Sequence, residues 1–160
     1  MEDVATHLLD HGLTVGTVES ATGGLISSLL TDVPGSSHFY NGSVVAYSND
    51  VKVRVVGVKQ STLETHGAVS AEVAEEMASG GRGLLGVDIC ISDTGIAGPG
   101  GGSRDKPVGL FYLGLSYKGG TYSRRFVVQG DRTINRKSTA EAALRWLDEM
   151  LTGRWTPGLS

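Results

Sequence analysis

The sequence predicts a three-layer α/β/α domain with a mixed β-sheet, and two features of its hydrophobic pattern lead to this prediction. From residue 2 to residue 95, segments with apolar residues at helical spacing alternate with short apolar runs, which is typical of a sheet covered by helices on both faces. Two β-rich segments joined by KGG then follow each other without a helix between them, which indicates an antiparallel hairpin. Parallel strands and a hairpin together give a mixed sheet.

The predicted elements follow one another in the order expected for such a domain. They are a helix at 2–11, a strand at 13–18, a helix at 23–33, a strand at 42–48, helices at 61–67 and 71–85, a strand at 87–95, hairpin strands at 108–117 and 121–129, and a helix at 131–153. The strands are short runs bounded by turn residues. Helical spacing is clearest in the last helix, where Ala143, Trp146, Leu147, Met150 and Leu151 share one face.

Capping residues mark where the predicted helices begin and end. Ser70 and Asp131 precede two of the helices, and their side chains can accept hydrogen bonds from the free N–H groups of a first turn. Asn49 or Asp50 is expected to cap a helical segment that follows the second strand. Gly67 ends the short helix before Ser70, because glycine readily adopts the backbone conformation that closes a helix.

Length and composition indicate one globular domain at residues 1–153, with a loose tail at 154–160. The 14 Lys and Arg residues against 17 Asp and Glu residues give a net charge of −3, which does not favour nucleic acid or an anionic membrane as a partner. The single cysteine, Cys90, excludes an internal disulfide, and no apolar run approaches the roughly 20 residues that span a bilayer. We therefore expect a cytoplasmic protein. Scattered histidines and a lone cysteine predict no metal site.

The stretch TVESATGG places Ser20 where a predicted strand ends and a helix begins. At such a turn a serine is exposed at the sheet edge, and the N–H groups of Gly23, Gly24 and Leu25 are expected to hold an oxyanion. This arrangement would combine a nucleophile with the donors that acyl transfer requires. The alternative is that Ser20 or Thr22 only caps the helix.

Lys52 is the predicted base for such a serine. It lies between Val51 and Val53, and a lysine in apolar surroundings can lose its proton near neutral pH. The alternative is a surface lysine that packs only its aliphatic stem against the protein. Tyr47 is expected either to relay a proton or to pack. The histidines have no evident carboxylate to orient them, which disfavours a Ser-His-Asp triad.

Two features indicate a binding site for an anion. Arg132 and Arg136 lie on one face at the start of the last helix, where cations oppose the helix dipole unless an anion binds beside them. Pairing with a carboxylate such as Asp131 is the alternative. The loop from Gly98 to Gly102 can wrap a phosphate, although it is neither a dinucleotide-binding fingerprint nor a Walker loop.

Four blocks in a fixed order make the chain similar to the CinA C-terminal domain family, also called the PncC family of nicotinamide-nucleotide amidases. The blocks are ESATGGL, YSNDVK, TGIAGPGGGSRDKPVG and GDR with Arg136, and the resemblance runs from about residue 4 to residue 151. It implies an α/β/α fold with a mixed, mostly parallel sheet of five strands. It also implies hydrolysis of nicotinamide mononucleotide to nicotinate mononucleotide and ammonia, without a cofactor.

The resemblance further implies which residues form the site. In the family's Ser/Lys mechanism, Ser20 would be the nucleophile and Lys52 the base, with Tyr47 in support. The substrate-binding positions expected from the same blocks are Thr22, Gly23, Gly24, Asn49, Thr94, Gly95, Gly98, Gly100, Gly101, Arg132 and Arg136. Many members carry a large additional N-terminal domain, and the chain resembles the stand-alone amidase form. A homo-oligomer is expected, with a dimer favoured.

Two positions depart from the family's pattern. Members commonly have Cys after the motif serine, whereas this chain has Ala21, which excludes a cysteine nucleophile there. The strand before the glycine loop is usually apolar up to its hydroxyl residue, whereas this chain has Asp93 before Thr94. Asp93 is expected to orient Lys52, to contact a ribose or to alter the substrate.

Two other functions stay open at this point. The chain could be a non-catalytic nucleotide-binding or partner-regulatory domain, in which Ser20 is only a helix cap. It could also be a Ser/Lys amidase that acts on another amide. Lys52 and Tyr47 favour an enzyme, because mere phosphate binding has no use for them.

Overall fold

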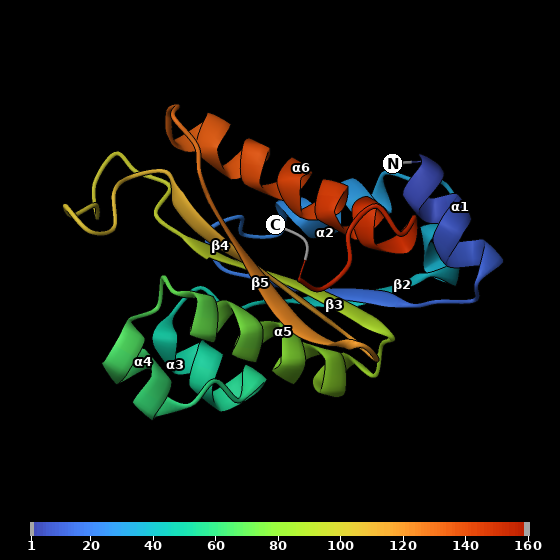
Figure 1. Ribbon diagram of the computed structural model, residues 1–160, viewed down its shortest axis with the longest axis horizontal. Coiled ribbons are helices and arrows are strands. Elements are labelled where there is room, and N and C mark those ends of the chain that lie inside the picture. The colour runs from blue at the N-terminus through green and yellow to red at the C-terminus, as the bar shows by residue number, and fades with distance from the viewer. Residues whose placement is uncertain (1, 159–160) are drawn as a thin grey trace.

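The computed structural model describes residues 2–158, which form three layers (Figure 1). The strands are β1 (Val15–Glu19), β2 (Tyr40–Val45), β3 (Ile89–Gly95), β4 (Leu110–Tyr117) and β5 (Gly120–Val127). The helices are α1 (Glu2–Asp10), α2 (Leu25–Thr31), α3 (Asn49–Val51), α4 (Gln60–His66), α5 (Ala71–Leu85) and α6 (Arg132–Leu151). A 3₁₀ turn, η1 (Ser36–His38), precedes β2, and a π-helical turn, η2 (Lys52–Val56), follows α3.

The five strands form one mixed sheet in the order β2-β1-β3-β4-β5. β1 lies between β2 and β3 and is parallel to both, while β4 is antiparallel to β3 and to β5. Four strands therefore point in one direction, and only β4 points in the other among the described residues. This confirms the predicted α/β fold with its mixed sheet. It also confirms the hairpin, whose strands are separated by Lys118 and Gly119.

Helices cover both faces of the sheet, as the alternating pattern predicts. α1, α2 and α6 lie on one face, and α3, α4 and α5 lie on the other (Figure 1). Successive residues of β3 point to opposite faces, so Ile89 and Ile91 join the core under α6 whereas Cys90 joins the core under α5. None of the helices in residues 2–158 is long and apolar enough to cross a membrane.

The structure corrects one predicted cap and confirms two. Ser70 and Asp131 cap α5 and α6 as predicted. The helical segment after β2 is capped by Ser48, whose hydroxyl accepts a hydrogen bond from a main-chain N–H of the first turn. Asn49 and Asp50 are already inside that turn, so the expectation that one of them caps it is wrong. Ser48 succeeds because its backbone is still extended, which is the geometry that a cap requires.

The glycine pair before α2 forms a turn and not the first turn of the helix. Gly23 and Gly24 have φ values of +60° and +106°, which are left-handed and incompatible with a right-handed helix. The helix predicted at 23–33 therefore begins at Leu25. The two glycines let the chain reverse tightly between β1 and α2, starting three residues after Ser20.

The segment after α6 is attached to the fold at Trp155. The Trp155 ring packs edge-on against Trp146 and Tyr122, with ring centroids 5.3 and 5.5 Å away. The main-chain N–H of Trp155 donates to the carbonyl of Glu149 over 2.9 Å. Of the tail predicted at 154–160, the last two residues lie outside the described part of the chain.

Two glycines of α5 give a matched test of how closely this helix packs on the sheet. A Cβ at Gly81 would lie 2.2 Å from Val18 Cγ2 and 2.8 Å from Cys90 Sγ, whereas a Cβ at Gly83 would meet nothing within 4 Å. We expect Gly81→Ala to lower the free energy of unfolding by about 1–3 kcal/mol through overpacking. Gly83→Ala should raise it by about 0.5–1 kcal/mol, because alanine favours a helix. Urea unfolding measures the free energy of unfolding of both variants, and equal effects of the two substitutions would contradict the close packing at Gly81.

Candidate active site

A pocket of about 280 Å³ lies beyond the carboxyl ends of β1 and β3 and beside the segment that follows β2. These three strands are parallel, so their carboxyl ends meet at one edge of the sheet, where α/β folds commonly bind ligands. The predicted site residues that line it are Ser20, Tyr47, Asn49, Lys52, Thr94, Gly95, Gly98, Gly100, Gly101 and Arg132. The predicted residues that do not line it are Thr22, Gly23, Gly24 and Arg136.

Ser20 and Lys52 meet at this pocket, although 32 residues separate them in the sequence. The distance from Lys52 Nζ to Ser20 Oγ is 3.0 Å. Only 8% of Ser20 and 1% of Lys52 is exposed, so little water reaches either side chain. The structure therefore excludes the alternative of a surface lysine and brings the predicted nucleophile and base into hydrogen-bonding contact.

The segment after β2 positions the Lys52 amine. The π-helical turn η2 begins at Lys52, and the Nζ atom reaches back to the carbonyl oxygens of Ala46 (2.8 Å) and Tyr47 (3.1 Å). Burial disfavours the charged form and lowers the pKa of Lys52, while the negative charge of Asp93 partly opposes this effect. The amine is thus held in place by neutral acceptors, and its burial favours the neutral form.

The main chain from Ser20 to Thr22 is held by its N–H groups and by its carbonyls. The carboxylate of Asp93 accepts hydrogen bonds from the N–H groups of Ser20 (3.0 Å) and Thr22 (3.2 Å). Arg136 donates to the carbonyls of Ala21 (3.0 Å) and Thr22 (2.9 Å), and the Ser20 carbonyl accepts a bond from within the turn. Among the described residues, the Ala21 N–H is the one main-chain polar group of this segment without a partner. Ala21 also lines the pocket.

The amides that we expected to hold an oxyanion are already used inside the fold. The N–H of Gly24 donates to Glu19 Oε1 over 3.0 Å, and the N–H groups of Gly23 and Leu25 donate to carbonyls of the turn over 3.1 and 3.3 Å. The prediction of an oxyanion hole at Gly23 and Gly24 is therefore wrong. The left-handed glycine turn directs these amides back to the protein and away from the pocket.

Glu19 is a residue of this region whose role the sequence analysis missed. It is wholly buried, and its carboxylate accepts hydrogen bonds from the N–H groups of Ile26 and Ser27, both over 2.9 Å, and from the hydroxyl of Thr22 over 2.7 Å. Glu19 thus caps α2 from the end of β1, so the alternative in which Ser20 or Thr22 caps the helix is wrong. An acidic residue just before a glycine pair and a helix was the available signal.

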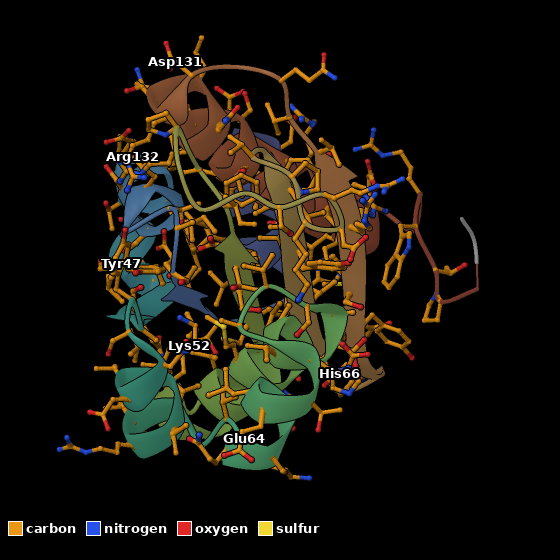
Figure 2. The ribbon with its side chains drawn as sticks, turned by 90° about the vertical axis from the view of Figure 1, so that its left-hand side faces the viewer. Tyr47, Lys52, Glu64, His66, Asp131 and Arg132 are labelled. Atoms are coloured by element: carbon orange, nitrogen blue, oxygen red, sulfur yellow. The ribbon has the colours of Figure 1, made fainter. Side chains whose placement is uncertain are left out.

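Tyr47 and Arg132 line the pocket on the same side as Lys52 (Figure 2). The Tyr47 side chain is 62% exposed, and its hydroxyl accepts a hydrogen bond from Arg132 Nη2 over 3.2 Å. Arg132 also donates from Nη1 to the carbonyl of Gly98 over 2.8 Å. The contact of Tyr47 with Lys52 is made by its main-chain carbonyl, so the structure gives no support to a proton relay through the phenol.

The glycine-rich loop after β3 lines the pocket together with Lys52 and Tyr47 and is tied to α6. Asn135 of α6 donates to the carbonyl of Ala97 over 2.9 Å, and Arg132 holds the next residue, Gly98. Gly98 and Gly101 both have φ of +86°, which non-glycine residues rarely adopt. The loop can therefore present main-chain N–H groups to an anion only with glycine at these positions. Among residues 2–158 there is no cluster of His, Cys, Asp or Glu that could hold a metal ion.

Comparison with known proteins decides the family. The model of the CinA C-terminal domain matches residues 1–151. The chain belongs to the CinA C-terminal domain family. It is 51% identical over 151 residues to a CinA-like protein of Chlorobaculum tepidum and 45% identical over 155 residues to one of Thermotoga maritima. These alignments cover 91% and 96% of this chain but only 36% and 38% of those proteins.

Crystal structures of other CinA proteins have the same fold. The competence damage-inducible protein A of Klebsiella pneumoniae superposes with a TM-score of 0.92 at 34% identity, covering 97% of this chain and 96% of its own. A competence/damage-inducible protein of Agrobacterium tumefaciens gives a TM-score of 0.89 at 39% identity, covering 94% of both chains. The resemblance deduced from the four sequence blocks is thus confirmed for family and fold.

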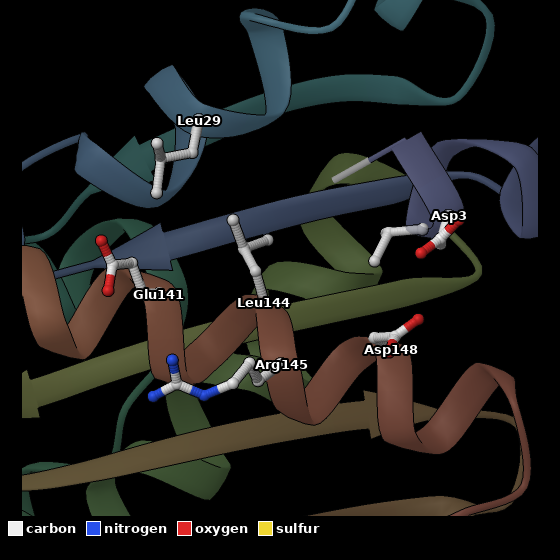
Figure 3. Close-up of a pocket in the computed structure, with 7 residues that line it drawn as sticks. Asp3, Leu29, Glu141, Leu144, Arg145 and Asp148 are labelled. Atoms are coloured by element: carbon white, nitrogen blue, oxygen red, sulfur yellow. The ribbon is translucent and has the colours of Figure 1, made fainter.

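This CinA domain has another hollow, on the face of the sheet that α6 covers, which lacks the chemistry of the pocket beside Ser20. It has a volume of about 360 Å³ and lies between α1, α2 and α6 (Figure 3). Leu29 and Leu144 line it together with charged side chains such as Glu141 and Arg145. It contains no serine, cysteine or lysine among its lining residues, whereas the Ser20 pocket holds the contact between Lys52 and Ser20, which makes that pocket the candidate active site.

Two arginines of α6, four residues apart, should differ in their effect on the stability of this CinA domain. We expect Arg136→Ala to lower the free energy of unfolding by about 1.5–3 kcal/mol, because two carbonyls of the Ser20 turn lose a charged donor. Arg132 is exposed, so Arg132→Ala should change the free energy by less than about 0.5 kcal/mol. Chemical denaturation of both variants tests this difference. Equal free energies of unfolding in the two variants would show that the contacts of Arg136 contribute nothing to stability.

Proposed function

We propose that this CinA domain hydrolyses the carboxamide of nicotinamide mononucleotide, giving nicotinate mononucleotide and ammonia. The observation that carries the proposal is the 3.0 Å contact between the buried Lys52 amine and the Ser20 hydroxyl at a pocket. A buried amine beside a serine is a suitable general base for a hydroxyl nucleophile. The substrate itself is inferred from the resemblance to the nicotinamide-nucleotide amidases.

The hydrogen-bond geometry of Lys52 suits a base that switches between two protonation states. As an ammonium ion, it donates to Ser20, Ala46 and Tyr47 with its three N–H groups. As a neutral amine it has two N–H groups for the two carbonyls, and its lone pair then faces the Ser20 hydroxyl. The amine can therefore take the serine proton without breaking its contacts to the main chain.

The N–H of Ala21 is the donor best placed to stabilise the oxyanion. It directly follows the nucleophile in the chain, and it is the main-chain group of the turn that the fold leaves free. An oxyanion donor on the residue after the nucleophile is a common solution in serine hydrolases. Because Asp93 and Arg136 fix the neighbouring peptide groups, this N–H is oriented before substrate binds.

The reaction then proceeds in two halves. Lys52 takes the proton of the Ser20 hydroxyl as Oγ attacks the carboxamide carbon, and the Lys52 ammonium gives that proton to the leaving nitrogen, which departs as ammonia. A nicotinate mononucleotide ester of Ser20 remains. In the second half Lys52 takes a proton from water, the resulting hydroxide attacks the ester carbonyl, and the proton returns to Ser20 as the acid product leaves.

Arg132 and the glycine loop are the groups proposed to hold the substrate's phosphate. Arg132 carries a positive charge at the pocket, and the loop at Gly98 to Gly101 lies against it. A guanidinium group and free main-chain N–H groups together suit a phosphate. Arg136 is engaged with the Ser20 turn and lies outside the pocket lining, so it is proposed to support the turn and not to bind substrate.

Ammonia release from nicotinamide mononucleotide tests the proposed reaction. We expect Ser20→Ala and Lys52→Met to lower kcat by at least about a thousandfold, since each removes a member of a unit that acts together. Lys59→Met is the matched control, because Lys59 is exposed and outside the pocket, and it should retain full activity. Binding of the nucleotide by the wild type without any ammonia release would contradict the proposal and favour a nucleotide-binding domain.

The pH dependence of this reaction should report the protonation of Lys52. Burial lowers its pKa, and only the neutral amine can accept the serine proton. As the pH falls through this lowered pKa, the neutral form of Lys52 is lost, so kcat/KM should fall tenfold per pH unit. At pH values above the pKa, kcat/KM should be constant. Initial rates between about pH 5 and pH 10 measure this profile. A flat profile would exclude Lys52 as the base.

A further inference from the structure

Asp93 lies on β3 beside the Ser20 turn, and its negative charge has no role yet in the proposed reaction. It is wholly buried on β3 and lies outside the residues that line the pocket. Its Oδ1 accepts a hydrogen bond from the N–H of Ser20 and its Oδ2 accepts one from the N–H of Thr22, over 3.0 and 3.2 Å. The hydroxyl of Thr22 lies 2.5 Å from Oδ1. A role in binding a ribose is therefore not supported, and the carboxylate faces the main chain beneath the nucleophile.

The Asp93 carboxylate replaces main-chain pairing where the sheet ends. The ladder between β1 and β3 extends only to the pair Val18 and Ser92. Beyond the end of β1, the N–H groups of Ser20 and Thr22 donate to the Asp93 side chain and not to backbone carbonyls. An apolar residue at this position would leave these two donors without that partner. Asp93 therefore holds both peptide groups that flank the free N–H of Ala21.

The charged groups around Asp93 come from three other parts of the fold. Glu19, at the end of β1, contacts the same Thr22 hydroxyl and has its own donors from the start of α2. Lys52, on η2, contacts Ser20 from the pocket side. Arg136, on α6, binds the carbonyls of the same turn. Lys52 is thus the cation of this group whose pKa responds to the Asp93 charge.

Burial shifts the pKa values of Asp93 and Lys52 in opposite directions. Burial, the main cause, raises the pKa of Asp93 to about 6, and the Glu19 charge adds to this, while hydrogen bonds from Thr22 and Ser20 oppose it. Above that pH Asp93 is ionised, and its charge raises the pKa of Lys52 against the effect of burial. The two groups therefore titrate as neighbours in one buried site.

We propose that Asp93 is a positioning residue of the Ser20–Lys52 pair, which fixes the turn through two N–H groups and, through its negative charge, sets the pH range in which the pair is active. The role of the pair as nucleophile and base rests on the proposed function. The geometric and electrostatic role of Asp93 is independent of which amide is the substrate.

The titration of Lys52 in the folded protein tests this role without any substrate. The chain has five lysines, so NMR of protein with ¹³C-labelled lysine gives a simple spectrum in which Lys52 is identified by its absence in Lys52→Met. We expect Asp93→Asn to move the Lys52 midpoint to lower pH by about 1–3 units, because the nearby anion that favours the ammonium form is gone. An unmoved midpoint in folded Asp93→Asn would overturn the proposal.

Asp50→Asn is the matched control for the loss of one negative charge. Asp50 lies only two residues from Lys52, but its side chain is 65% exposed and pairs with Arg54 on the surface. Water screens a charge at that position, so the Lys52 midpoint should stay at its wild-type value. A shift equal to that of Asp93→Asn would show that net charge, and not the buried position of Asp93, is responsible.

Thr22 provides a second test that leaves Asp93 in place, and it decides the matter if Asp93→Asn does not fold. Thr22→Val keeps the shape but removes the hydroxyl that contacts both carboxylates, so Asp93 should take up its proton at a higher pH, and the midpoint of the Asp93 step in the Lys52 resonance should rise. Thr22→Ser keeps the hydroxyl and should restore the wild-type midpoint. Identical midpoints in the two variants would overturn the proposed coupling.

The activity assay separates this inference from the proposed function. If nicotinamide mononucleotide is the substrate, the acidic limb of kcat/KM should move in Asp93→Asn by the same number of pH units as the Lys52 midpoint. A limb that stays in place while the NMR midpoint moves would contradict the claim that Asp93 sets the active pH range. Because the NMR titration needs no substrate, an absence of ammonia release by the wild type would contradict the amidase proposal alone.

Discussion

The amine of Lys52 is buried in the protein, and the arrangement of the pocket depends on how the fold accommodates it. Removing an ammonium ion from water costs several kcal/mol unless the protein supplies acceptors or the group loses its charge. The carbonyls of Ala46 and Tyr47 supply two acceptors, and the Ser20 hydroxyl supplies the third. The same burial that is unfavourable for the ammonium form makes the neutral amine accessible. A lysine held in this way is suited to proton transfer and poorly suited to a purely structural role.

Two buried carboxylates, Glu19 and Asp93, accept hydrogen bonds from main-chain N–H groups that neither the sheet nor the helix can pair. β1 ends and α2 has not yet begun, so the N–H groups between them need acceptors other than ladder or helix carbonyls. Glu19 accepts those at the start of α2, and Asp93 accepts those around Ser20. Ser20, the proposed nucleophile, therefore lies on a turn fixed by charged groups, and the Ala21 N–H stays free.

The sequence was sufficient for the layers, the mixed sheet and the pair Ser20 and Lys52, because each depends on local pattern or on the resemblance between whole blocks. It was insufficient where tertiary distance decides. Ser20 and Asp93 are 73 residues apart, and only the register of β1 on β3 brings them together. The direction of the Gly23 and Gly24 amides depends on left-handed φ values that residue identity permits but does not determine. The position of Arg136 also depends on tertiary packing. It was expected at the phosphate, but it contacts the carbonyls of the Ser20 turn.

Reaction with a fluorophosphonate tests most directly whether Lys52 makes Ser20 a nucleophile, because the product does not turn over. Mass spectrometry of the digested protein locates the modified serine, and the other serines of the chain serve as internal controls. We expect modification of Ser20 in preference to the others, at a rate that falls on acidification and that is lost in Lys52→Met. Equal labelling of Ser20 in the wild type and in Lys52→Met would contradict the proposal that Lys52 activates Ser20.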